Sequence, residues 1–135
     1  LSLVASPKSK GRKLADLKRY ACLVYSSVQG DDHWVLTPPG GEERSIPVKG
    51  TLRSNNLSAV LAAARAGMGL AILPWYVARE SLADGSITQV LADHGLPTQE
   101  LHAVFPSPRL VPQKVSHFIE WLRGELEGEW WSRAP

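Results

Sequence analysis

The chain is poor in cysteine, and its apolar residues do not gather into long runs. Cys22 is the only cysteine among 135 residues, which excludes an internal disulfide and a zinc site built from cysteines. No apolar run approaches the roughly 20 residues needed to cross a bilayer. The first residues also lack the basic start and apolar stretch of a secretory signal. These absences predict a cytoplasmic protein with no membrane partner.

A strong excess of one charge is also missing, since 15 basic residues face 13 acidic ones. The distribution is uneven, because the first nineteen residues carry a net charge of +5. The basic residues there are Lys8, Lys10, Arg12, Lys13, Lys18 and Arg19, against Asp16. Clustered cations can bind nucleic acid by counterion release. No aromatic platform or recognition-helix pattern accompanies them, so we prefer a solvated surface segment.

Patterns typical of catalysis and metal binding are absent from the sequence. The four histidines are scattered, with no spacing that brings two onto one helical face. They are His33, His94, His102 and His117. Gly67 and Gly69 follow an expected helix, whereas glycines that cradle a phosphate precede one. No G-x-S-x-G turn is present, and Cys22 lies in an apolar stretch where a thiol packs. We therefore predict no enzyme activity, no metal and no cofactor.

The clearest positive pattern runs from residue 51 to residue 74. Ser54, Asn55 and Asn56 are residue types that cap a helix N-terminus. Apolar residues then follow at helical spacing, and Gly67 suits the left-handed position after the helix. These apolar residues are Leu57, Val60, Leu61 and Ala64. The apolar run 68–73, stopped by Pro74, predicts a strand covered on both faces.

Further strands and helices alternate along the chain. Strands are expected at 1–5, 20–25, 87–91 and 101–105, with a hairpin joining 34–36 to 46–48. A single helical turn is expected at 15–18, a short helix at 75–83, and a final helix whose apolar face holds Val115, Phe118, Ile119, Leu122 and Leu126. This alternation predicts an α/β domain with a mixed sheet.

Several of these segments together carry a family resemblance. They include Ala5-Ser6-Pro7, Cys22-Leu23-Val24-Tyr25, Ser54-Asn55-Asn56, Ala66-Gly67-Met68-Gly69 through Leu73-Pro74, Leu82-Ala83-Asp84-Gly85 and Ala103-Val104-Phe105-Pro106. In this order the chain resembles the C-terminal, effector-binding part of LysR-type transcriptional regulators. The resemblance covers nearly the whole chain.

The resemblance implies a fold like that of type 2 periplasmic binding proteins, in which two α/β lobes close on a small molecule. Residues 1–135 would then form the C-terminal part of an effector-binding domain. Residues 7–100 would be lobe II, and residues 101–135 would be the return strand and final helix of lobe I. The rest of lobe I and the winged helix-turn-helix that binds DNA in the family would be absent, so we expect no DNA binding by this chain alone.

The expected ligand site lies at the helix start. A helix N-terminus can hold an anion through unpaired N–H groups, although Ser54 or Asn55 could equally serve only as a cap. The resemblance implies an effector site at Ser54, Asn55 and Asn56, with Tyr25 and Ser26 facing the same cleft. An acidic residue is usual in the family at the place of Asn56, so a neutral amide there favours an organic anion. The resemblance also implies a homodimer or higher oligomer.

Two other functions fit the sequence less well. A solute-binding module of a transport system would share the fold, and the sequence upstream of Leu1 would distinguish it, since a signal peptide supports transport and a helix-turn-helix supports regulation. A small hydrolase or transferase lacks a recognisable nucleophile and base.

Overall fold

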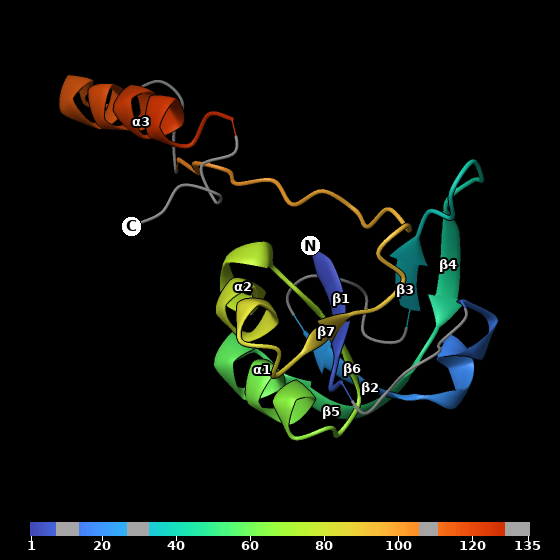
Figure 1. Ribbon diagram of the computed structural model, residues 1–135. Coiled ribbons are helices and arrows are strands. Elements are labelled where there is room, and N and C mark those ends of the chain that lie inside the picture. The colour runs from blue at the N-terminus through green and yellow to red at the C-terminus, as the bar shows by residue number, and fades with distance from the viewer. Residues whose placement is uncertain (8–13, 27–32, 106–110, 129–135) are drawn as a thin grey trace. The chain divides into compact units, whose positions relative to one another are not determined.

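A five-stranded mixed sheet organises the first part of the chain (Figure 1), with the strand order β5-β2-β6-β1-β7. The strands are β1 (Ser2–Ala5), β2 (Ala21–Tyr25), β5 (Lys49–Ser54), β6 (Leu70–Leu73) and β7 (Thr88–Gln89). β2 runs parallel to both β5 and β6, whereas β1 runs antiparallel to β6 and β7. The predicted α/β fold with a mixed sheet is confirmed.

The computed structural model describes residues 1–7, 14–26, 33–105 and 111–128. Two compact units divide the chain, the first spanning residues 1–99 and the second residues 100–135. Four residues of the basic segment, Lys8, Lys10, Arg12 and Lys13, lie outside the described residues.

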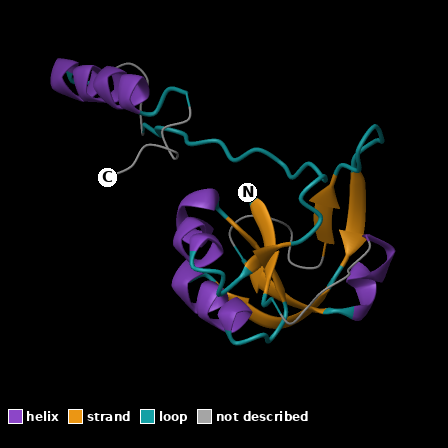
Figure 2. Cartoon of the chain, viewed as in Figure 1, coloured by secondary structure: helices purple, strands orange, loops and turns teal. Residues whose placement is uncertain are grey.

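Two helices cover one face of the sheet, as Figure 2 shows. They are α1 (Leu57–Arg65) and α2 (Trp75–Ala83), in close agreement with the predicted helices. Val60 and Ala64 of α1 are fully buried, as the helical spacing predicted. They pack in one cluster with alternate residues of three strands, namely Val4, Leu23, Ala71 and Leu73. The helical face of the sheet is therefore a dry apolar layer.

The opposite face is covered by a hairpin and a short 3-10 helix. The hairpin joins β3 (His33–Leu36) to β4 (Arg44–Pro47), with Trp34 opposite Ile46, so the predicted hairpin is confirmed. The 3-10 helix η1 (Leu14–Arg19) contributes the buried Leu17. These residues pack against the alternate strand positions Leu3, Cys22, Leu70 and Ile72. All four residues of β6 are buried, as expected for a strand with both faces covered.

The turn between α1 and β6 follows from Gly67. This glycine has φ +77°, a left-handed conformation that costs other residues more. Its N–H donates to the carbonyl of Ala64, and the Met68 N–H donates to the carbonyl of Ala63, both at 3.0 Å. Met68 therefore belongs to the turn. The prediction that placed it in the buried strand was wrong, and its side chain is 55% exposed.

The strand expected at 87–91 is reduced to the two residues of β7. The Val90 N–H still donates to the carbonyl of Leu3 at 2.8 Å, but Leu91 turns away from the strand direction with φ +52°. A branched apolar residue rarely adopts that conformation. The strand therefore cannot continue past Val90.

In the second unit, α3 (Gln113–Glu125) confirms the predicted final helix. The rings of Phe118 and Trp121 lie 6.0 Å apart, centre to centre, and both side chains are exposed. The predicted strand at 101–105 is wrong, because this segment has no regular structure. A strand needs hydrogen-bonding neighbours, and no described segment pairs with it. Val104 is 88% exposed accordingly.

Candidate functional site

Three parallel strands end at the same edge of the sheet. Tyr25, the last residue of β2, pairs with Ser54, the last residue of β5. On the other side of β2, Leu23 pairs with Ala71, so β6 ends beside β2 at Leu73. Parallel strands bring their carboxyl ends together, and ligands bind at such edges in open α/β sheets.

All five residues predicted to bind the ligand lie at this edge. The Ser26 N–H donates to the carbonyl oxygen of Ser54 at 3.1 Å, which continues the pairing of the two strands by one residue. Asn55 and Asn56 follow directly on the chain and are exposed. Tyr25 and Ser54 are half-buried. The structure thus brings together residues that are 28 or more positions apart in sequence, while their role in ligand binding stays a prediction.

Asn56 is the N-cap of α1. Its backbone is extended, with φ −111° and ψ 111°, and its Oδ1 accepts from the N–H groups of Ser58 at 2.9 Å and Ala59 at 3.3 Å. Ser54 adds a hydrogen bond, because its Oγ accepts from the Asn56 N–H at 3.0 Å. The predicted capping of this helix is confirmed. The capping bonds also occupy N–H groups on which the anion hypothesis relied.

The donors that remain at this edge belong to side chains. An asparagine whose oxygen caps a helix keeps its two amide hydrogens, and a hydroxyl that accepts one hydrogen bond still carries a proton. Asn56 and Ser54 therefore retain donor capacity, as does the exposed amide of Asn55. None of the five is an acidic or a basic residue.

The nearest cation on β5 is Arg53, on the opposite face of the strand. Arg53 pairs with Val24, whereas Ser54 pairs with Tyr25, and successive residues alternate between the two faces. A Cβ on Gly50 would lie 3.3 Å from Nη2 of Arg53, so the guanidinium folds back over that glycine. Its side chain thus leaves the strand on the face opposite to that of Ser54 and Tyr25.

Sequence reasoning missed the start of α2 as part of this edge. Trp75 begins the helix two residues after the end of β6, and Pro74 is its N-cap, with no side-chain cap hydrogen bond. Trp75 and Tyr76 are 38% and 50% exposed. The available signal was an aromatic pair placed directly after a buried parallel strand.

Within the described ranges, no three His, Cys, Asp or Glu side chains lie close enough together to hold a metal ion. None of the helices described here is long and apolar enough to span a bilayer.

Comparison with known proteins identifies the family. The LysR substrate binding domain model matches residues 1–127, so the chain belongs to that family. It is 33% identical over 97 residues to the HTH-type transcriptional regulator PtxR of Pseudomonas aeruginosa, covering 71% of this chain and 31% of PtxR. It is 32% identical over 116 residues to the HTH-type transcriptional regulator DmlR of Escherichia coli, covering 83% of this chain and 36% of DmlR.

A solved structure shows the same fold. The regulatory domain of AphB from Vibrio vulnificus superposes with a TM-score of 0.65 at 25% identity, covering 91% of this chain and 63% of that one. The chain thus has the mixed α/β fold of a LysR regulatory domain, like that of type 2 periplasmic binding proteins. It spans about a third of the length of the curated regulators that it matches.

Proposed function

We propose that this chain binds a small organic anion, as part of the effector-binding domain of a LysR-type transcriptional regulator. The observation that carries the proposal is the parallel pairing of β2 with β5, which sets Tyr25 and Ser26 beside Ser54, Asn55 and Asn56. Membership of the LysR substrate binding domain family supports a ligand at this edge.

The chemistry of the edge suits a carboxylate. Asn55 and Asn56 supply amide N–H donors, and Ser26 and Ser54 supply hydroxyl donors, without a neighbouring acidic side chain among the five residues. A hydrogen bond from a neutral donor to a charged acceptor is worth about 1.5–3 kcal/mol. Two or three such bonds, aided by the positive end of the α1 dipole, would hold an anion without a salt bridge.

Regulation would follow from closure of two lobes on the anion. Residues 7–100 would form lobe II, and residues 101–135 would contribute the return strand and final helix of lobe I. A ligand that binds the closed arrangement more tightly shifts the population towards it. In a homodimer or higher oligomer, that shift would change the spacing of helix-turn-helix heads outside this chain, through which DNA would be bound.

The proposed function also implies that the protein is cytoplasmic and that it is not an enzyme. The curated relatives PtxR and DmlR are transcriptional regulators, which favours regulation over the transport alternative. A helix-turn-helix encoded upstream of Leu1 would support regulation, and a signal peptide there would support transport.

Isothermal titration calorimetry of the protein in its full natural length, against a panel of organic acids, tests the site. We expect at least one acid to bind, and Asn55→Ala to weaken it about tenfold or more through the loss of a donor to a charged acceptor. If no acid binds and Asn55→Ala behaves as the parent does, the proposal is wrong.

Asn56→Asp separates ligand binding from folding. The aspartate keeps a cap oxygen and adds a negative charge at the helix start, so α1 should be as stable as before or more so. The added charge repels an anion, and the substitution also removes the two amide N–H donors of Asn56. We expect unchanged or higher thermal stability together with weaker anion binding, whereas unchanged anion affinity would place the ligand elsewhere.

A further inference from the structure

A buried hydroxyl lies at the start of the first strand. Ser2 is only 5% exposed, and no hydrogen bond within the described part of the chain involves its Oγ. Buried polar side chains in folded proteins almost always have a hydrogen-bond partner. The Ser2 hydroxyl can both donate and accept, so its full bonding capacity is unused among the described residues.

This hydroxyl lies on the face of the sheet that α2 covers. Ser2 pairs with Leu73, the last residue of β6, and Pro74 and α2 follow directly on the chain. Successive strand residues alternate between the two faces, so Ser2 and Val4 share a face. Val4 packs in one buried cluster with Leu73 and with Ala78 of α2. Ser2 therefore points to the side of the sheet on which α2 packs against β1.

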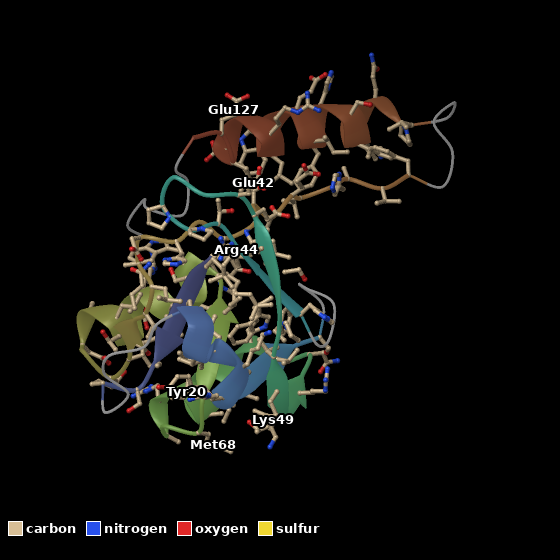
Figure 3. All side chains as sticks on the ribbon, turned by 90° about the vertical axis from the view of Figure 1, so that its right-hand side faces the viewer. Tyr20, Glu42, Arg44, Lys49, Met68 and Glu127 are labelled. Atoms are coloured by element: carbon tan, nitrogen blue, oxygen red, sulfur yellow. The ribbon has the colours of Figure 1, made fainter. Side chains whose placement is uncertain are left out.

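The direction of α2 places its first turn over Ser2. The helix starts at the carboxyl end of β6, whereas Met68 and Lys49 mark the opposite, amino end of the parallel strands (Figure 3). One helical turn is about as long as two strand residues. Because Ala78 packs with Val4, the turn before Ala78 lies over the residue two positions before Val4, which is Ser2. The start of α2 lies beside the start of β1 accordingly (Figure 1).

The positive end of α2 is not neutralised by its own segment. Pro74 is the N-cap and gives no side-chain hydrogen bond, and the first turn holds no acidic residue. The N–H groups of Val77 and Ala78 donate to the carbonyl oxygen of Pro74 at 3.1 and 3.2 Å. The Trp75 N–H has no acceptor within the described ranges. Unpaired N–H groups and the helix dipole together attract an anion to such a helix start.

We propose that the start of α2 and the Ser2 hydroxyl form a second anion site, which binds a compact oxyanion such as inorganic phosphate. The Trp75 N–H and the Ser2 hydroxyl donate to its oxygens. A compact ion is required, because Ser2 is almost wholly enclosed. β1 is three strands away from β5, a distance of about 14 Å, so this site is separate from the one proposed at Ser54, Asn55 and Asn56. The inference goes beyond the proposed function and does not depend on it.

The test is thermal unfolding of the protein in its full natural length, with phosphate replacing chloride at constant ionic strength. We expect the Tm of the parent to rise with phosphate concentration, as binding to the folded state requires. Ser2→Ala and Trp75→Pro should each weaken the apparent phosphate affinity about fivefold or more. Proline suits the first position of a helix and removes its N–H. Trp75→Ala is the matched control, because it loses the same side chain but keeps the N–H, and it should bind phosphate as the parent does.

Ser81→Ala is the control for Ser2→Ala, since Ser81 is a buried serine of α2 six residues beyond Trp75. It should leave the phosphate effect unchanged. A parent that does not respond to phosphate, or a response that is equal in the parent, Ser2→Ala and Trp75→Pro, would overturn the inference. Asn55→Ala should keep the phosphate effect. If Asn55→Ala abolishes it, phosphate occupies the effector site, so the second site is wrong while the proposed function stands.

Discussion

A Cβ atom on Gly69 would lie 2.5 Å from the carbonyl oxygen of Ala21. Gly69 stands just before β6 and Ala21 opens β2, so the two parallel strands begin with their backbones in closer approach than any side chain permits. Alanine at position 69 would have to push backbone aside, since the nearest atoms are not the end of a flexible side chain.

Gly69→Ala should therefore destabilise the protein by about 1–3 kcal/mol, the usual cost of overpacking. Urea unfolding followed by circular dichroism measures the change. Gly41→Ala is the control, because a Cβ there meets Pro38 at an ordinary 3.5 Å. We expect little change in the control, and equal stability of the two variants would show that β2 and β6 can separate without cost.

Removal of the α1 cap gives a second prediction. Asn56→Ala loses the oxygen that accepts from Ser58 and Ala59, so the free energy of unfolding should fall by about 1 kcal/mol. Asn56→Ser restores a cap oxygen and should recover most of the loss. Thermal unfolding of the parent, Asn56→Ala and Asn56→Ser measures these differences in stability. An Asn56→Ala variant as stable as the parent would mean that other interactions stabilise the start of α1.

The end of α2 carries a titration that can be tested by mutation. Hydrogen bonds from the Ser86 side chain and then from its backbone N–H lower the pKa of Asp84 below its ordinary value of 3.8. A lowered folded-state pKa contributes stability above the unfolded-state value, and this contribution is lost as the pH falls through the folded-state pKa.

Ser86→Ala removes the side-chain hydrogen bond, so the Asp84 pKa should move up towards 3.8. Carboxyl chemical shifts followed by NMR between pH 2 and pH 6 report that value. Ser86→Thr keeps the hydroxyl and should titrate as the parent does. A pKa that does not respond to Ser86→Ala would assign the lowering to the backbone N–H of residue 86 and the charge of Arg65.

The single thiol should be inert in the folded protein. Cys22 lies in β2, on the face of the sheet that the hairpin and η1 cover, and it is fully buried. Its Sγ lies 3.5 Å from the carbonyl oxygen of Tyr20. A thiol reagent can then reach it only through unfolding or a large local opening. We expect labelling to be slower by a factor of about a thousand or more than in concentrated urea. Labelling at comparable rates in both solvents would show that this core opens freely.

The local patterns of the sequence predicted much of the fold. The apolar run at 68–73 produced a buried strand, shortened to 70–73, and the helical spacing from Leu57 and the glycine at 67 produced the expected helix and turn. Each is stabilised by neighbours close in sequence or by burial of the whole segment. Such local patterns could not predict which distant segments pair with each other. The position of β1 between β6 and β7, and the bridge between Thr37 and Gly95 beside the hairpin, depend on contacts across the fold.

The predicted strand at 101–105 failed for a related reason. Its alternating side chains suit a strand, but alternation cannot supply a neighbour for its backbone hydrogen bonds. The candidate site was likewise predicted only in part. Residue types predicted a cap at 54–56, and the structure adds that Ser26 joins them through Ser54. Trp75 was missed because only the parallel direction of β6 reveals at which edge α2 begins.

The placement of β1 between β6 and β7 has a practical consequence for anyone who trims or tags this protein. The opening residues of a chain can often be removed freely, yet here Leu3, Val4 and Ala5 are almost wholly enclosed. Deleting the first five residues would remove the strand between β6 and β7 and leave β7 without a hydrogen-bonding neighbour. An affinity tag is best joined through a flexible spacer ahead of Leu1, and proteolysis near Ser6 should unfold the first unit as a whole.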